Sequence, residues 1–227
     1  MSLTVGDLLA KVPKGQSRSF KSNTPGESND RFVEVAYNWN YGSVLTWGNR
    51  PPMEEAPWMG SRSKPRIGLD GMLEPELAFD REAGELVDFY MPSPSVHVIS
   101  DRLLALINRI DPDSLEVRPV VVKTRGGQAR LNMVMPRRLL EAVDAERCDV
   151  DIVAKKLDTI WVARVNFPRG AVFDPQLASD IHNFADLDMG SRWFWSSELV
   201  NTAKQAGIKG LYTKKPGGLA SEQIDEL

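Results

Sequence analysis

Few side chains in this sequence could do chemistry, and the two histidines, His97 and His182, come first. A histidine can act as a general base when a carboxylate or a nucleophile lies within hydrogen-bond reach. His182 stands in an acidic segment that carries Asp174, Asp180, Asp186 and Asp188. Their spacing matches no familiar set of metal ligands, and aspartates in loops are commonly solvated. We predict no metal site and keep an enzyme with a site near His182 as an alternative.

His97 lies between Val96 and Val98 in a short apolar run typical of a β-strand. Because successive side chains of a strand point to opposite faces, we expect its imidazole on the face away from these valines, at the surface or half-buried. No carboxylate stands beside it in the sequence to orient the ring. The pattern therefore predicts an ordinary histidine without a catalytic role.

Cys148 is the only cysteine, so no internal disulfide can form and a reducing compartment is expected. It lies in "AERCDVD", where acidic neighbours would raise the pKa of the thiol and make it a poor nucleophile. The sequence also lacks a phosphate-binding glycine loop, a nucleophile elbow and a zinc-protease helix motif. We therefore predict no catalytic residues and no cofactor.

Residues 118–138 form a basic segment that has no acidic residue before Glu141. Its cations are Arg118, Lys123, Arg125, Arg130, Arg137 and Arg138. Lys123, Arg125 and Arg130 lie closest to the turn expected at Gly126-Gly127, where they could contact phosphates or an acidic protein surface. A solvated hairpin tip that keeps strand edges from pairing is the alternative.

Four aromatic residues, Trp39, Tyr41, Trp47 and Trp58, crowd into one short span beside a segment rich in proline and methionine. Tryptophan and tyrosine are frequent at binding hot spots, but they can equally pin an irregular connection onto the core. We keep this group as candidate partner-binding residues, together with Lys123, Arg125 and Arg130.

The elements that would position these residues have clear local signals in the second half of the chain. Ser100 and Ser196 each follow an apolar run and precede a leucine by three positions, which predicts a strand, a serine N-cap and a helix twice over. Gly207 predicts the end of the second helix. Residues 115–124 and 129–135 are expected to pair as a hairpin, and 136–143 to form a short helical piece. Whether the two strand–helix–strand units are a duplication stays open.

Composition limits the classes of protein that fit. A chain of 227 residues with 42% hydrophobic and 26% charged residues can bury a full core. The net charge of −3 argues against a polyanion as the main partner. The start "MSLTVGDLLAKVPKG" lacks the pattern of a signal peptide, and no segment has the ~20 apolar residues that span a bilayer. We expect a cytoplasmic protein without membrane contact.

The expected fold class is α+β, with a mainly antiparallel twisted sheet and helices packed against it. We expect an irregular N-terminal region over residues 1–84, with a strand hairpin and long loops. The α+β core domain would span residues 85–214, and residues 215–227 would form a flexible tail.

The order of three motifs in the second half carries a family likeness. They are "EVRPVVV", "AVDAERCDV" and "WSSELVNTAKQAGIKGLYT", within about residues 85–214. This part of the chain resembles a family of bacterial immunity proteins of polymorphic toxin and type VI secretion systems, immunity-protein family eleven. Cys148 stands where that family usually has a serine. The resemblance implies no catalytic residues.

The resemblance implies a protein that binds and neutralises a cognate toxin by occlusion, as a monomer or a homodimer. Two other functions remain open from the residues themselves. One is the enzyme with an unrecognised site near His182, and the other is a nucleic-acid-binding module that uses the basic hairpin 118–138. The net negative charge makes nucleic acid the less expected partner.

Overall fold

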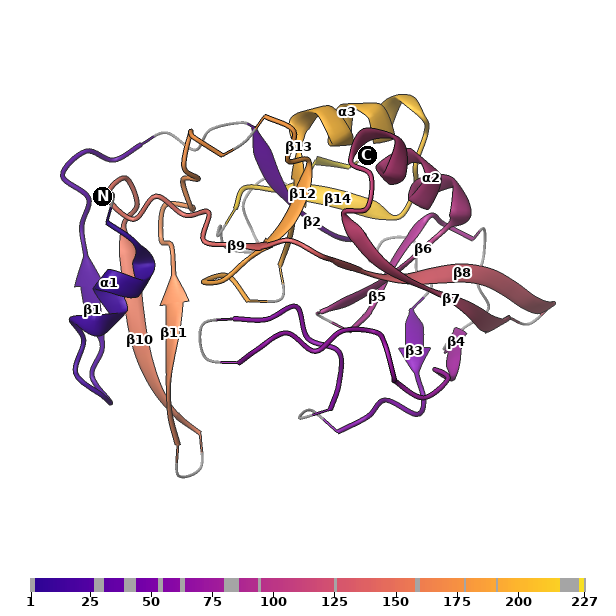
Figure 1. Cartoon of the computed structure of the whole chain (residues 1–227), viewed down its shortest axis with the longest axis horizontal. Coiled ribbons are helices and arrows are strands. Elements are labelled where there is room, and N and C mark those ends of the chain that lie inside the picture. Colours follow the sequence, from indigo (N-terminus) through magenta and orange to yellow (C-terminus); the bar gives the residue numbers. More distant parts are fainter. Residues whose placement is uncertain are drawn as a thin grey trace.

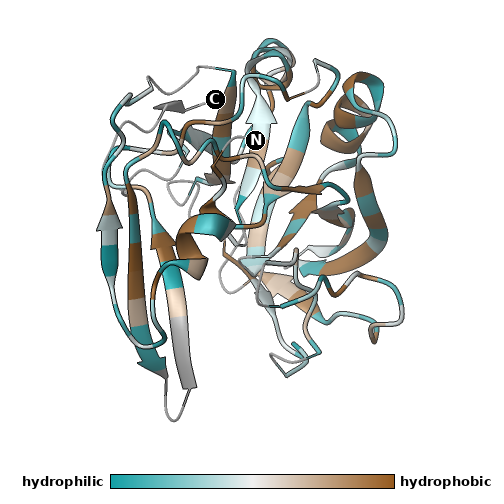
Figure 2. Ribbon diagram, turned by 60° about the vertical axis from the view of Figure 1, so that its left-hand side comes forward, coloured by the Kyte–Doolittle hydropathy of each residue, from teal (hydrophilic) through white to brown (hydrophobic). Residues whose placement is uncertain are grey.

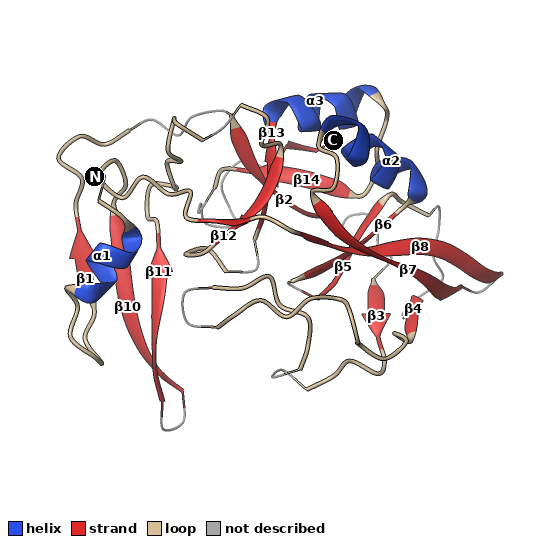
Figure 3. Ribbon diagram, in the orientation of Figure 1, coloured by secondary structure: helices blue, strands red, loops and turns tan. Residues whose placement is uncertain are grey.

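The computed structural model describes residues 3–26, 31–38, 44–52, 55–61, 64–79, 86–93, 95–124, 126–157, 160–177, 179–190, 192–216 and 225–226. These residues form a mostly β structure with three sheets and three helices (Figures 1 and 3). The strand pairs are antiparallel apart from two, β4 with β7 and β9 with β12. The expected mainly antiparallel pairing is therefore present, but it is divided among three sheets instead of one.

The first six-stranded sheet has the order β3-β4-β7-β8-β6-β5. Its strands are β3 (Leu45–Trp47), β4 (Leu77–Phe79), β5 (Phe89–Ser93), β6 (Val96–Ile99), β7 (Leu115–Thr124) and β8 (Gly127–Pro136). β7 and β8 pair over their full length, from Leu115 opposite Pro136 to Thr124 opposite Gly127. The predicted hairpin is confirmed, and it extends beyond the body of the molecule at the right of Figure 1.

The second six-stranded sheet has the order β15-β14-β2-β13-β12-β9. Its strands are β2 (Phe32–Tyr37), β9 (Leu139–Leu140), β12 (Asn183–Asp186), β13 (Trp193–Ser196), β14 (Leu211–Lys214) and β15 (Asp225–Glu226). The third sheet has three strands, β1 (Arg18–Phe20), β10 (Val150–Leu157) and β11 (Ile160–Asn166), in the order β1-β10-β11. It lies at the opposite end of the molecule from the β7–β8 hairpin (Figure 1).

The helices are α1 (Val5–Ala10), α2 (Asp101–Ile110) and α3 (Ser197–Gln205). The hydroxyls of Ser100 and Ser196 accept hydrogen bonds from the backbone N–H groups of Leu103 and Leu199, so both predicted N-caps are confirmed. Gly207 follows α3 at a φ of 63°, the left-handed conformation predicted for a helix end. α2 and α3 lie side by side above the two larger sheets (Figure 1).

The two strand–helix–strand units share one topology. β5 pairs with β6, α2 follows, and the chain then crosses to β7 on the far side of β8. In the same way β12 pairs with β13, α3 follows, and the chain crosses to β14 on the far side of β2. The inserted strand, β8 in the first unit and β2 in the second, is antiparallel to both of its neighbours. The similarity of the two sequence segments therefore reflects a repeated arrangement. In each unit a strand from outside the unit, β8 or β2, lies between the strand before the helix and the strand after it.

Two hydrophobic cores hold these layers together. The larger contains inward side chains of the first two sheets and of α2 and α3, with Trp193, Trp195 and Phe89 fully buried. The smaller joins α1 and β10 to the other face of the second sheet through a cluster of four rings, Phe32, Phe173, Phe184 and Phe194. Figure 2 shows that the most hydrophobic stretches lie in strands and helices.

The helical piece predicted over residues 136–143 is wrong. The backbone there pairs with another strand: the carbonyls of Arg138 and Leu140 accept hydrogen bonds from the N–H groups of Ala185 and Leu187. The result is β9, parallel to β12. Apolar spacing favoured a helix, but tertiary pairing with a strand about 45 residues later prevailed.

Strands from the first 84 residues enter all three sheets, since β1 belongs to one, β2 to another, and β3 and β4 to the third. The boundary expected at residue 85 stays a prediction, but the segment before it supplies strands to both cores. No helix within the described ranges is long and apolar enough to cross a membrane.

Candidate functional site

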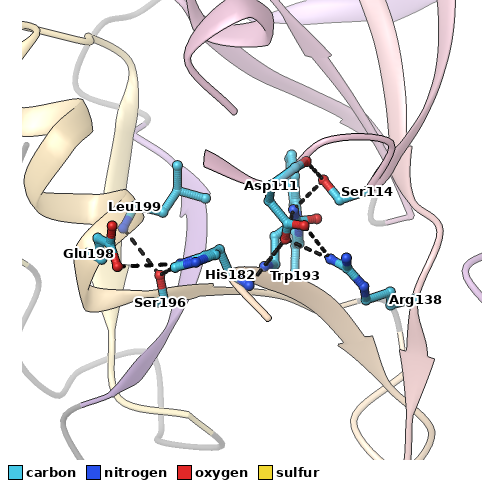
Figure 4. A network of polar contacts seen from close by, with 9 residues as sticks. Asp111, Ser114, Arg138, His182, Trp193, Ser196, Glu198 and Leu199 are labelled. Atoms are coloured by element: carbon cyan, nitrogen blue, oxygen red, sulfur yellow. Dashed lines mark hydrogen bonds and ion pairs between the residues drawn. The ribbon is translucent and has the colours of Figure 1, made fainter. Parts of the chain in front are cut away.

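A buried polar junction centred on Asp111 joins the two strand–helix–strand units (Figure 4). Asp111 caps the C-terminal end of α2, and its side chain is only 2% exposed. Both carboxylate oxygens accept from the Arg138 guanidinium at 2.6 Å. One oxygen also accepts from the backbone N–H groups of His182 and Asn183 at 3.1 and 3.0 Å. One carboxylate thus ties the end of α2 to the start of β12.

The junction continues through Asn183, whose side chain is fully buried. Its amide nitrogen donates to Asp111 at 2.9 Å and to the hydroxyl of Ser114 at 2.6 Å, and its amide oxygen accepts from the indole N–H of Trp193 at 3.3 Å. The Ser114 hydroxyl in turn donates to the carbonyl of Asp111. A buried network with its donors and acceptors matched in this way fixes one arrangement of the two units.

His182 lies beside this junction but has the contacts of a helix cap. Its Nδ1 lies 2.9 Å from the hydroxyl of Ser196 and 3.8 Å from a carboxylate oxygen of Glu198. In a Ser-His-acid triad the serine and the acid contact opposite ring nitrogens, whereas here both lie at Nδ1 (Figure 4). The Ser196 hydroxyl is also occupied, since it accepts the N–H of Leu199. These contacts support α3 and provide no nucleophile with a base oriented for attack.

The first unit has the same cap with a different partner. Ser100 donates its hydroxyl to Asp88 at 2.6 Å, and Asp88 takes the place that His182 has beside Ser196. The backbone agrees, since the N–H groups of Ser100 and Ser196 donate to the carbonyls of Asp88 and His182. Arg102 then pairs with Asp88 at the helix position where Glu198 approaches His182. The two caps are equivalent in position, with the acidic and the basic residue exchanged.

Burial opposes ionisation of Asp88, but the hydrogen bonds from Arg102 and Ser100 lower the pKa of its carboxyl below its ordinary value. The Asp88–Arg102 pair is therefore ionised in neutral solution. It also fixes the loop after α3, because Arg102 donates to the carbonyl of Gly207 and Asp88 accepts from the N–H of Lys209. Each unit thus contacts the other near its helix cap.

Replacing either cap serine by alanine is expected to lower the free energy of unfolding by about 1–2 kcal/mol. Ser196→Ala and Ser100→Ala each remove the acceptor for a first-turn N–H and a second hydrogen bond, to His182 or to Asp88. Urea denaturation followed by circular dichroism measures the loss. Ser179→Ala, at an exposed turn position, is the matched control and should stay within about 0.5 kcal/mol of wild type. Equal stabilities of all four proteins would contradict the caps.

The aspartates around His182 do not converge on it. Asp186 is fully buried and accepts hydrogen bonds from the backbone N–H groups of Ala142, Asp188 and Met189. Burial, with a further contribution from Asp188, raises the pKa of Asp186 to about 7. Asp174 accepts from the N–H of Gln176 in a local turn. Within the described ranges there is no group of three or more acidic, histidine or cysteine side chains that could hold a metal ion.

Cys148 is buried in the smaller core, where its sulfur accepts from the N–H of Val172 at 3.1 Å. Burial raises the pKa of the thiol to about 11, with smaller contributions from Asp144 and Asp149. The predicted direction is confirmed, although desolvation is a larger cause than the acidic neighbours. The cysteine therefore acts as a small apolar side chain.

The expectation that His97 would lie at the surface or half-buried is wrong. Its side chain is 1% exposed and packs between Phe89 and Trp193, with ring centroids 5.2 and 4.9 Å away. Its strand β6 is covered on both faces, so alternation along the strand leaves no exposed side. Burial lowers the pKa of His97 to about 3. It is a neutral core residue.

The candidate aromatic group is divided between core and surface. Trp47 lies in the larger core, and its indole N–H donates to Asn49. Trp58 is half-buried, with the Lys64 ammonium 5.8 Å from its ring centroid. Trp39 and Tyr41 lie outside the described residues. Trp47 therefore offers little surface to a partner, and Trp58 offers part of one face.

Three cations of the basic segment are used inside the molecule. Arg118 donates to the carbonyl of Met72 at 2.6 Å, Arg137 donates to the carbonyl of Leu115 at 2.9 Å, and Arg138 pairs with Asp111. Lys123 and Arg130 are exposed, and Arg125 lies outside the described residues. The six cations thus do not form one exposed track for a phosphate backbone.

The Asp111 junction has no signal in the sequence, because the partners of its carboxylate lie 27 to 72 residues away along the chain. The sequence pattern marked Asp111 only as the residue before a proline that ends a helix. The sequence "LEVRPVVVKT" shows that Val117, Pro119 and Val121 share one face of the strand, but not that the structure leaves this face exposed.

The comparisons with known proteins bear on the whole molecule. A family model described as an immunity protein family, Imm11, matches residues 38–215. None of the curated proteins matches the chain. The match covers both strand–helix–strand units, the β7–β8 hairpin and the Asp111 junction, and it begins well before residue 85, where the likeness in the sequence was first evident. This chain belongs to the Imm11 immunity protein family.

Proposed function

We propose that this protein protects bacterial cells by binding a cognate toxin of a polymorphic toxin system in the cytoplasm and occluding its active surface. The observation that carries the proposal is the family match over residues 38–215, since membership of an immunity family implies a toxin partner. Inhibition by binding requires a preformed surface on a rigid body and no chemistry of its own.

The contacts around the two helix caps support binding over catalysis. His182 and Ser196, the pair nearest to a catalytic arrangement, serve as a helix cap, and Cys148 is buried with a raised pKa. The Asp111 junction and the two cores hold the sheets in one arrangement, so the loss of entropy on binding is small. A rigid, chemically inert surface suits occlusion of a toxin.

Co-expression tests the proposal directly. The genes beside this one are searched for a toxin domain, which is then expressed alone, with this protein, and with an unrelated immunity protein. We expect growth arrest in the first and third cases, growth in the second, and co-elution of the two proteins on size-exclusion chromatography. Neither rescue nor a complex would overturn the proposal. Rescue without a complex would contradict occlusion and return attention to an enzymatic function.

A further inference from the structure

One face of β7 is exposed although the strand belongs to the centre of a sheet. Val117, Pro119, Val121 and Lys123 alternate along it and are all exposed, while Val120 and Val122 between them are buried. Val117 and Val121 keep 36% and 43% of their surface in water, among the largest values for apolar residues of the described chain. We call these four residues, with Arg130 opposite Val121 on β8, the β7 outer face.

On this side the neighbouring strand β8 is covered at Asn132 and Val134, and β7 is not. α2 lies over β6 and β8, where Asn132 donates to Asp101 at the start of the helix and Val134 is fully buried. Val134 is the cross-strand neighbour of Val117, and Asn132 that of Pro119. The cover therefore ends between β8 and β7, so the exposed side chains form a strip beside the helix.

The exposed side chains of β7 cannot become buried by a rotation of the strand. On the opposite side of β7, Glu116 accepts from the N–H of Leu69 and pairs with Arg66, and Arg118 donates to the carbonyl of Met72. Burial opposes ionisation of Glu116, but the hydrogen bonds from Arg66 and Leu69 keep the pKa of its carboxyl low. These contacts hold β7 in register, so its valines stay in water until another molecule covers them.

The charge at the turn end of this face is positive although the chain carries a net charge of −3. Lys123 and Arg130 lie at the end of the apolar strip near the hairpin turn, and both are exposed. The sequence from Val117 to Pro136 has no acidic residue. The face therefore combines an apolar strip with a cationic end, and it complements an apolar patch bordered by carboxylates.

We propose that the β7 outer face is the docking surface for the cognate toxin, whose contact surface is an apolar patch flanked by acidic side chains. This inference rests on the proposed function. Val117, Pro119 and Val121 lose their exposed apolar surface to the toxin, and Lys123 and Arg130 pair with its carboxylates. A net charge of −3 by itself would favour a basic toxin surface, and at this contact we expect an acidic one.

The chain contains a matched control on the β10–β11 hairpin. Val153, 39% exposed, lies opposite Arg164, as Val121 lies opposite Arg130, and Lys155 follows Val153 by two positions, as Lys123 follows Val121. The apolar strip does not continue there, because Asp151 occupies the position two residues before Val153. The two hairpins thus present the same exposed pair, but only β7 extends it with Pro119 and Val117.

The test measures affinity for the purified toxin domain by isothermal titration calorimetry, at low and at physiological salt. The charge-reversal pair Lys123→Glu and Arg130→Glu is expected to weaken binding on the order of 100-fold and to remove most of the salt dependence. Val121→Asp is expected to have an effect of similar size. The controls Lys155→Glu with Arg164→Glu, and Val153→Asp, should bind as wild type does. All substituted residues are exposed, so thermal unfolding should change little.

The outcomes separate this inference from the proposed function. Wild-type affinity for all variants, or weaker binding only in the β10–β11 controls, overturns the β7 surface while the immunity function stands. If the wild-type protein itself fails to bind the toxin, the proposed function fails first, and this inference with it. Charge reversal that strengthens binding would show a basic toxin surface and also overturn the inference.

Discussion

Asp111→Ala is expected to lower the free energy of unfolding by about 3–5 kcal/mol, because it removes one partner of a buried charge pair. The Arg138 guanidinium then loses the acceptor that both of its short hydrogen bonds use. Asn183, which is fully buried, loses the acceptor for its backbone N–H and one of the two acceptors for its side-chain amide. A lower midpoint of urea denaturation, with an unchanged dependence on urea concentration, is the expected measurement.

Asp180→Ala is the control for removal of a carboxylate from the same part of the molecule. Asp180 is exposed, two residues before His182, and its loss should change stability by about 0.5 kcal/mol or less. A double-mutant cycle of Asp111→Ala with Arg138→Ala should give a coupling of about 1–3 kcal/mol, since the two side chains share their hydrogen bonds. A loss below 1 kcal/mol for Asp111→Ala would show that the junction does not hold the two units together.

The parts of this fold that could be predicted from sequence depend on residues close together in the chain. A serine cap needs only the N–H three positions later, so Ser100 and Ser196 were recognisable. Likewise the turn signal at Gly126-Gly127 brings two flanking strands together, and Gly207 ends a helix by its own backbone conformation. In each case the competing structure would have to overcome a local preference.

The parts that could not be predicted depend on distant pairing. β2, near the N-terminus, inserts between β13 and β14, and nothing in its own residues identifies those neighbours. The exposure of His97 is wrongly predicted because alternation along a strand gives an exposed face only when one face of the sheet is open to solvent. The same reasoning explains the helix wrongly expected over residues 136–143, where pairing of β9 with β12 decides the structure.

Only part of the β7 outer face could be predicted from the sequence. Lys123 and Arg130 could be predicted as exposed because they flank a turn. The valines of β7 resemble core residues, and their exposure follows from where α2 ends its cover of the sheet, a matter of tertiary packing. Family membership was visible because the order of several weak motifs survives even when no single motif identifies a function.

His97 and Asp186 are expected to give opposite pH dependences to stability. The pKa of His97 is about 3 in the folded protein against an ordinary value of 6.5, so below pH 6.5 the unfolded chain binds a proton that the folded protein does not. Stability from this group therefore falls as the pH falls. The pKa of Asp186 is about 7 against 3.8, so above pH 4 the unfolded chain has released a proton that the folded protein keeps, and stability falls as the pH rises.

Between about pH 4 and pH 6.5 the two contributions oppose each other, each with a slope of about 1.4 kcal/mol per pH unit. The wild-type protein should accordingly show a nearly flat stability in the upper part of this range. Toward pH 4, Asp88, Glu116 and Asp149 take up protons in the unfolded chain before they do in the folded protein, where their pKa values are lowered, so stability falls. A substitution of His97 or of Asp186 removes the contribution of that residue to the pH dependence of stability and leaves the contribution of the other.

Urea denaturation at a series of pH values tests this compensation. For His97→Phe, which keeps a ring between Phe89 and Trp193, stability should fall by about 2–3 kcal/mol as the pH rises from 4.5 to 6.5. For Asp186→Asn it should rise by a similar amount over the same interval. Because each variant also changes packing, the slope carries the test and the absolute stability does not. Parallel curves for the wild type and both variants would mean that neither group titrates differently in the folded protein, and the burial of His97 and Asp186 would then lack its expected consequence.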